Sequence, residues 1–306
     1  MARHKPLNLR LKLKDTVIKL YMEGLSYRNI QRRIKMLYGV ELPRSTISYW
    51  VRNLHTPEGK VKRLDKSDMD AYAFIMGASI GDAYLKKRPG KKGDKHIIIM
   101  RVRDRDFLEE YIKNISKVIP GIKPRIKIGR RGFYTTTIYN KLLYLDIKKY
   151  IENPEKICQD LKNHKQAFLK GIYDAEGFVT VSTGVSFSGA IGLVNSDADL
   201  CSIISRFLSD LNIKHRMYSI DRRGEKIRIG RWVGRINKIV YVILISSFMS
   251  VCRFSDLIGF RIHRKQDKLN DFIDITTTYG KSDLAIEKWR EKYSKIKNRW
   301  VKKKDL

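Results

Sequence analysis

The spacing of apolar residues predicts a helical segment at the N-terminal end of the chain. Between residues 14 and 54, apolar side chains recur every three or four positions, as on one face of amphipathic helices. Gly24 and Ser26 interrupt the first run, and a third helix is expected after Pro43. Pro57 and Gly59 then predict a linker. We expect a helical domain over residues 1–55 and a linker over residues 56–69.

From residue 70 onward, helical periods alternate with the two-residue period of strands. The pattern predicts a helix, two strands, a helix, two strands and a helix, and the same order recurs from about residue 163. The fold class expected is α+β, with two αββαββα repeats over residues 70–152 and 153–275. In the second repeat the hairpin near residues 221–238 is longer. Strands are expected near residues 83–88, 96–103, 122–128, 133–139, 178–182, 191–195 and 239–245.

Each repeat opens with a similar apolar segment that carries a glycine and an acid at matching positions. Gly77 precedes Asp82 by five positions, and Gly171 precedes Glu176 by the same number. Internal repetition of this kind indicates duplicated structural units. Small residues four positions apart, such as Gly77 and Gly81, allow two helices to approach closely. If the two helices pack together, their ends bring Asp82 and Glu176 side by side, whereas an isolated acid there would be a solvated helix end.

Charge composition narrows the chemistry that such a pair of acids would perform. The chain has 64 Lys and Arg residues against 32 Asp and Glu, a net charge of +32, which favours a polyanionic partner such as nucleic acid. Paired carboxylates are suited to Mg²⁺, which activates water and offsets charge on a phosphate. The three scattered cysteines argue against a disulfide framework or a zinc site. No apolar stretch is long enough for a membrane span or a signal peptide, so we expect an intracellular, cytoplasmic or nucleoid-associated protein.

The two motif segments resemble the paired motifs of LAGLIDADG homing endonucleases in their single-chain, two-repeat form. The resemblance covers about residues 70–275; Ala83 departs from the glycine usual in the first motif, and Asp174 to Gly177 match a known variant of the second. It implies that the repeats are related by a pseudo-twofold axis and form a saddle. It further implies a monomeric, site-specific endonuclease that breaks both strands of DNA with Mg²⁺ or Mn²⁺.

The resemblance also implies roles for individual residues. Asp82 and Glu176 would be catalytic metal ligands, assisted by the backbone carbonyls of Gly81 and Ala175. Asp174 matches Ile80 of the first copy and is expected to have no catalytic role. Basic residues that would complete the active sites are Lys156, His263 and Lys265, for which a solvated surface position is the alternative reading.

Basic residues on strands and on the third N-terminal helix are predicted to bind DNA. Strand residues such as Arg101 and Arg103 alternate with apolar ones, which places basic side chains on one sheet face. The N-terminal helices resemble a helix-turn-helix, although a helical arm packed on the body is also possible. The full set is Arg44, Ser45, Thr46, Ser48, Arg52, Arg101, Arg103, Lys123, Arg125, Lys127, Lys214, Arg216, Arg222, Arg223, Lys226, Arg228 and Arg231.

Two questions stay open at the level of sequence. Residues 276–306 are predicted to form a basic helix with a stripe of Trp289, Tyr293, Ile296 and Trp300, either docked on the body or in contact with DNA or a partner. Two alternatives to the endonuclease also remain. One is a non-cleaving transcriptional regulator on the same scaffold, and the other is a splicing maturase that binds intron RNA, because basic charge does not separate DNA from RNA.

Overall fold

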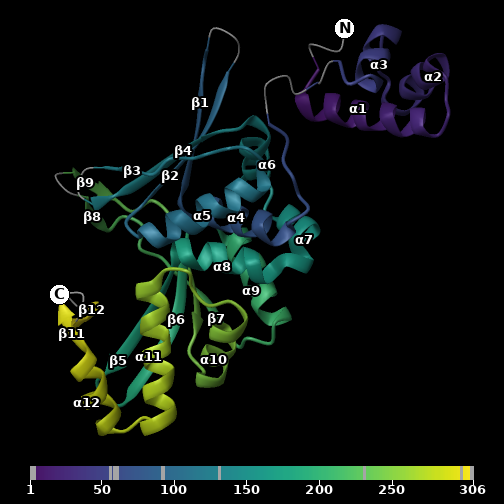
Figure 1. The fold of residues 1–306 in the computed structure, drawn as a ribbon. Helices are drawn as coiled ribbons and strands as arrows, with labels where there is room; N and C mark the ends of the chain where they lie inside the picture. Colours follow the sequence, from purple (N-terminus) through teal and green to yellow (C-terminus); the bar gives the residue numbers. More distant parts are fainter. Residues whose placement is uncertain are drawn as a thin grey trace. The chain divides into compact units, whose positions relative to one another are not determined.

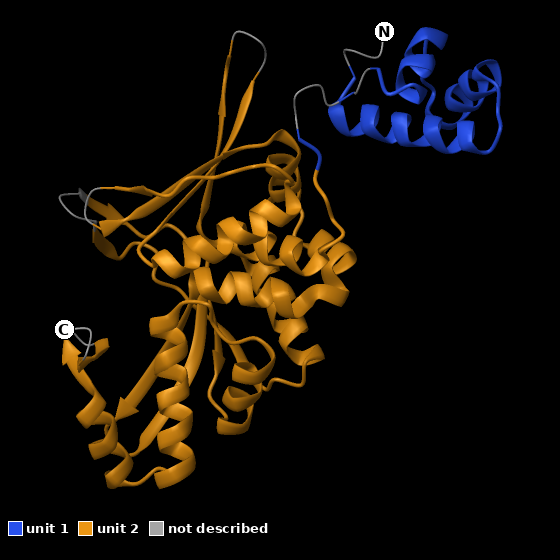
Figure 2. Cartoon of the chain, viewed as in Figure 1, with its two compact units in different colours: residues 1–63 blue, residues 64–306 orange. Residues whose placement is uncertain are grey.

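The computed structural model divides the chain into two compact units, residues 1–63 and 64–306 (Figures 1 and 2). It describes residues 5–54, 57, 62–90, 94–129, 132–229, 232–296 and 299–303. The division between the units falls inside the segment predicted to be a linker. Within the described residues, the helices are all too short or too polar to cross a membrane.

In its described residues, the first unit forms three helices around a small apolar core. They are α1 (Leu7–Met22), α2 (Tyr27–Tyr38) and α3 (Arg44–Val51). The hydroxyl of Ser26 accepts a hydrogen bond from the Asn29 backbone N–H and so caps α2, while Gly39 ends that helix with a positive φ of 62°. Val17, Ile34 and Trp50 are among the residues that fill the core. The predicted helical segment is confirmed, whereas the helix-turn-helix interpretation stays a prediction.

The first repeat has the predicted order αββαββα. Its elements are α4 (Met69–Asp82), β1 (Ala83–Arg88), β2 (Lys95–Val102), α5 (Arg105–Val118), β3 (Lys127–Ile128), β4 (Tyr134–Tyr139) and α6 (Lys141–Glu152). The strands form an antiparallel sheet in the order β1-β2-β4-β3. Strand β3 is much shorter than the predicted 122–128, because Pro124 has no N–H to donate to a ladder. A short helix α7 (Glu155–Leu161) and a 3₁₀ turn (Lys162–His164) lead into the second repeat.

The second repeat repeats this order with one inserted hairpin. Its elements are α8 (Lys165–Glu176), β5 (Gly177–Thr183), β6 (Phe187–Asn195), α9 (Ala198–Asp210), β7 (Arg216–Ile220), β10 (Val240–Ile245) and α10 (Phe248–Leu257). The sheet order, β5-β6-β10-β7, matches that of the first repeat. The longer hairpin is explained by β8 (Lys226–Ile229) and β9 (Trp232–Arg235), which pair with each other as a separate sheet. The α+β class and the two repeats predicted from the sequence are confirmed.

The C-terminal part differs from the prediction. Helix α11 (His263–Tyr279) crosses the predicted boundary at residue 275, and α12 (Asp283–Lys292) ends before Tyr293. A hairpin of β11 (Tyr293–Ile296) and β12 (Arg299–Lys302) follows, so the prediction of one helix through Trp300 is wrong.

The aromatic residues read as a helical stripe instead form a cluster between α12 and the hairpin. The rings of Trp289 and Tyr293 stack with centroids 4.0 Å apart, and Trp300 meets Trp289 edge-on. The Trp300 indole N–H donates to the Val181 carbonyl of β5 at 2.9 Å. These tertiary contacts favour the hairpin over continued helix.

Helices α4 and α8 pack against each other through reciprocal glycines. A Cβ atom built on Gly77 would overlap the Phe168 carbonyl oxygen, and one on Gly171 would overlap the Phe74 carbonyl oxygen. The two contacts exchange equivalent residues, as a local twofold axis requires. At the end of the pair, a Cβ on Gly81 would overlap the Cβ of Ala175. Close packing of the two motif helices is therefore observed, and the glycines are what permit it.

We predict that Gly171→Ala destabilises the second unit by about 3 kcal/mol or more, because the added methyl meets backbone atoms of Phe74 and Ala78 that cannot rotate away. Chemical denaturation measures the change. Gly184→Ala is the matched control, since the nearest atom to its new Cβ would be the Ser182 hydroxyl at 3.8 Å. Equal stability of the two variants would contradict this account of the seam.

Candidate active site

The two motif acids are the last residues of the two packed helices. Asp82 ends α4 and Glu176 ends α8, and each is followed directly by the first strand of its repeat. A Cβ on Gly81 would lie 3.2 Å from Glu176 Cγ, which places the end of one helix against the acid of the other. The glycine seam therefore holds two carboxylates at the junction of the repeats, as the motif spacing predicts.

The surroundings of these acids favour their protonated forms. Burial against the protein, followed by the negative charge of Asp82, raises the pKa of Glu176 to about 7. Burial also raises the pKa of Asp82 to about 6, although part of this residue is open to solvent, and Asp104 adds to the effect. A pair of carboxylates that resist ionisation together is an environment that binds a cation favourably.

Lys265 supplies positive charge beside both acids. It lies on the first turn of α11, is only 7% exposed, and lowers the pKa of both Asp82 and Glu176 by Coulomb attraction. Its Nζ donates to the carbonyl oxygens of Asp174 at 2.6 Å and Tyr173 at 3.2 Å. Burial lowers the pKa of this amine to about 8. Lys265 is thus a buried group at the acid pair rather than a solvated surface charge.

The other two basic candidates lie in different surroundings. Lys156, on α7, donates from Nζ to Gln159 Oε1 at 2.6 Å within its own helix. The side chain of His263 is 85% exposed and stands 3.4 Å from an Asp106 oxygen. The interactions that the structure records for its described residues join neither side chain to Asp82 or Glu176, so their catalytic role stays a prediction.

Asp174 is a buried group that the sequence argument set aside. Its side chain is 1% exposed, and Oδ1 accepts hydrogen bonds from the backbone N–H groups of Arg261 at 2.9 Å and Ile262 at 3.3 Å. Burial raises its pKa to about 7, against the effect of those two bonds. The first repeat has Ile80 at the matching position, so the repeat comparison contained a signal, namely an acid where its counterpart is apolar.

The first sheet presents basic side chains on the face opposite its core. Arg101 and Arg103 are exposed while Val102 between them is buried, as the alternation predicts. Both guanidinium groups lie over the Phe133 ring, 4.6 Å and 5.1 Å from its centroid, which restricts their motion. The exposed residues of the neighbouring segment that extend this basic face are Lys123, Arg125 and Lys127.

The second repeat also exposes its predicted basic residues. Lys214 and Arg216 are exposed while Ile213 is buried. In the inserted hairpin, Arg222 pairs with Glu225 and Arg223 pairs with Asp221, whereas Lys226 and Arg228 lie on exposed positions of β8. Arg231 lies outside the residues that the structure describes.

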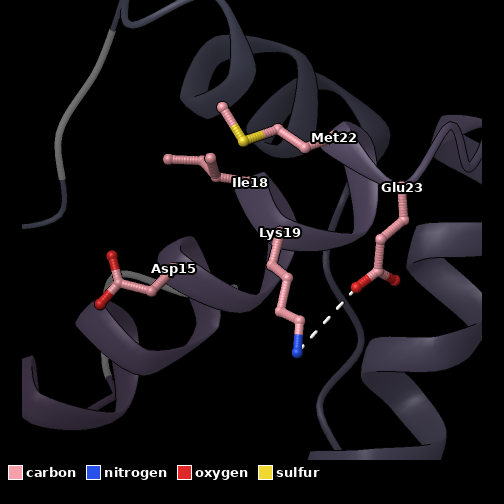
Figure 3. A pocket seen from close by; sticks show the side chains of 5 residues that line it. All are labelled: Asp15, Ile18, Lys19, Met22 and Glu23. Carbon is pink, nitrogen blue, oxygen red and sulfur yellow. Dashed lines mark ion pairs between the residues drawn. The ribbon is translucent and has the colours of Figure 1, made fainter.

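In the first unit, the predicted DNA-binding residues lie on and after α3. Arg44, Ser45 and Arg52 are exposed, and Thr46 and Ser48 are half-buried. The hollow in Figure 3 belongs to α1 and is lined by Asp15, Ile18, Lys19, Met22 and Glu23. Its Lys19 and Glu23 form an ion pair at 4.0 Å, and its lining contains none of the residues predicted to bind DNA or metal.

Comparison with known proteins identifies one domain of the chain. Residues 163–259 match the LAGLIDADG-like domain family. The uncharacterised protein MJ0398 of Methanocaldococcus jannaschii is 26% identical over 268 residues, which cover 86% of this chain and 94% of that protein. MJ0314 of the same organism, also uncharacterised, is 24% identical over 196 residues, 61% of this chain and 69% of that protein.

Two solved structures show partial similarity of fold. One is I-DmoI in complex with DNA and Mn, which has a TM-score of 0.45 and 22% identity and covers 62% of this chain and 96% of its own. The other is the LAGLIDADG meganuclease I-AabMI bound to uncleaved DNA, with a TM-score of 0.45 and 16% identity, over 71% of this chain and 96% of its own. For the second repeat, the resemblance recognised from the paired motifs is confirmed by the match over residues 163–259.

We predict that Glu176→Gln stabilises the metal-free protein at neutral pH. The folded state raises the pKa of Glu176 from 4.5 to about 7, so the folded state binds this proton more tightly than the unfolded state. The stability of the wild type should therefore fall, relative to the variant, as pH rises from about 4.5 to 7. Above pH 7 the variant should melt about 2–4 °C higher in a thermal scan with chelator. Glu287→Gln, on the exposed face of α12, should show no such trend.

Proposed function

We propose that this chain belongs to the LAGLIDADG family and is a metal-dependent endonuclease that cuts both strands of double-stranded DNA at a long, specific target. The observation that carries the proposal is the acid pair at the end of the glycine seam, with Lys265 beside it. Two acids and a buried lysine at the junction of two repeats are suited to the hydrolysis of two phosphodiester bonds, one on each DNA strand.

The donor set suits Mg²⁺ or Mn²⁺. Asp82 and Glu176 offer hard oxygen ligands, and the carbonyls of Gly81 and Ala175 precede them at the same helix ends. The mutual repulsion that raises the pKa of Glu176 is relieved when a cation lies between the acids. A divalent ion bound there would activate water for attack on a phosphate and offset the charge that develops.

Lys265 has the properties of a group that stabilises charge or transfers a proton during this reaction. Its pKa of about 8 keeps much of it protonated at neutral pH while allowing the proton to leave. Its two carbonyl partners fix Nζ at the end of α8, next to Glu176. We assign it to the active site and treat Lys156 and His263 as secondary candidates.

The exposed basic faces of both sheets would bind the DNA backbone and base edges. Among these groups, Arg101 and Arg103 both lie over the Phe133 ring. Arg44 of α3 and Arg52, which follows that helix, would lengthen the contacted site. Because one chain supplies both acids, we propose that the protein acts as a monomer, and its DNA substrate would place it inside the cell.

We predict that Asp82→Asn and Glu176→Gln each abolish the double-strand break, because each removes a charged ligand from one side of the pair. The assay incubates a randomised plasmid library with Mg²⁺ and sequences the cut ends. We expect a loss of at least about 100-fold in linear product for each variant. Glu287→Gln is the matched control and should cut like the wild type.

The outcomes of this assay separate the candidate functions. Linear product that persists in both acid variants would refute the assignment of the metal site. Binding to DNA without any cutting by the wild type would instead favour a regulator, and preferential binding to structured RNA would favour a maturase.

We predict that the double variant Arg101→Ala with Arg103→Ala weakens DNA binding and reduces its dependence on salt. If both guanidinium groups contact phosphates, the slope of log K against log salt should become shallower by about 2. Fluorescence anisotropy over a series of salt concentrations measures the slope. Arg206→Ala removes an arginine of α9 that pairs with Glu155 and should leave the slope unchanged. An unaltered slope in the double variant would exclude phosphate contacts by this pair.

A further inference from the structure

The segment between α10 and the first turn of α11 is fixed by acids from both repeats. Arg261 and Ile262 are bound to the second repeat, because both donate their backbone N–H groups to Asp174 Oδ1. The next residue, His263, is bound to the first repeat, because its backbone N–H donates to Asp106 Oδ2 at 2.6 Å. These bonds occupy N–H groups at the start of α11, where its own N-cap residue, Ile262, provides no side-chain acceptor.

A bidentate ion pair strengthens the link to the first repeat. Arg264 donates from Nε and Nη2 to the two carboxylate oxygens of Asp104, at 2.6 Å and 2.8 Å. The geometry is the fork arrangement that makes Arg and carboxylate pairs both strong and directional. Asp104 and Asp106 stand at the start of α5, so two consecutive residues of α11 are held by one short stretch of the first repeat.

We propose that residues 260–265 form a clasp whose acids, Asp174 from the second repeat and Asp104 and Asp106 from the first, are positioning residues that hold Lys265 at the acid pair. The proposal rests on the proposed endonuclease function. The clasp lies after the residues that match the LAGLIDADG-like domain family, since that match ends at residue 259.

The geometry gives the buried acid at position 174 a structural role. Lys265 follows Ile262 by one turn, and its Nζ returns to the carbonyls of Tyr173 and Asp174 on the same stretch of α8. Asp174 therefore contacts the segment twice: its side chain accepts the Arg261 N–H, and its backbone carbonyl accepts a hydrogen bond from the Lys265 amine. The first repeat carries Ile80 at the matching position, so it has no counterpart of the Asp174 anchor.

The test compares Asp174→Val, which removes the acceptor, with Asp174→Asn, which keeps an oxygen at the same place. Lysine acylation followed by peptide mass spectrometry reports the exposure of Lys265, and the exposed Lys113 serves as the internal reference. We expect Lys265 to react about fivefold faster in Asp174→Val, as for the loss of a hydrogen bond, and to change less than about twofold in Asp174→Asn. Single-turnover cleavage should fall about tenfold in Asp174→Val, with DNA affinity within about twofold of wild type.

A second pair of variants keeps the proposal testable if Asp174→Val does not fold. Asp106→Ala removes the acceptor of the His263 N–H, whereas Asp106→Asn retains it, and the same acylation pattern is expected. Continued protection of Lys265 in Asp174→Val and Asp106→Ala would overturn the clasp, as would a uniform rise in reactivity of all buried lysines. Faster acylation with unchanged cleavage would overturn its role in positioning. If the wild type cuts no DNA, the endonuclease proposal fails, while acylation still decides whether the clasp exists.

Discussion

The contact between two glycines and two backbone carbonyls sets the geometry on which the rest of the second unit depends. Because Gly77 and Gly171 lack side chains, α4 and α8 meet backbone to backbone, and their ends are brought to one place. Each helix then runs directly into the first strand of its sheet, so the same contact fixes the relation between the two sheets and the acid pair. A wider separation of the helices would move the carboxylates apart and leave no shared site.

The acid pair shows a conflict between folding and chemistry. Burial raises the pKa of both acids, the negative charge of Asp82 adds to the cost of ionising Glu176, and Lys265 offsets only part of these costs. Lys265 is itself strained electrostatically, since burial lowers the pKa of its amine. Ionisable groups with perturbed pKa values are common where proteins bind ions or transfer protons. Their charges are unfavourable in the folded protein alone, and a bound ion of opposite charge relieves that cost.

The sequence predicted the repeats and the N-terminal helices better than it predicted the C-terminal part of the chain or the third member of the site. Motif spacing sufficed for Asp82 and Glu176 because a helical seam converts sequence register directly into proximity. Lys156, His263 and Lys265 were equivalent candidates on sequence grounds, and only the position of α11 distinguishes Lys265 as the buried one. The stripe through Trp300 matched a helical period, but its aromatic residues are explained equally well by packing across a hairpin. Long-range contacts of this kind leave no local pattern to read.

The hairpin at the end of the described chain also bears on how the protein is made. Strand β5 is at the edge of its sheet, and an unpaired edge is a template for association with other chains. The Trp300 indole N–H donates a hydrogen bond to the Val181 carbonyl of this edge strand. Lys268 of α11 in turn donates from Nζ to the Trp300 carbonyl. Because more than a hundred residues separate Val181 from Trp300, this protection arrives only after the ribosome has passed the hairpin. Until then the Val181 carbonyl lacks this partner, and the edge of β5 is open to association with other chains.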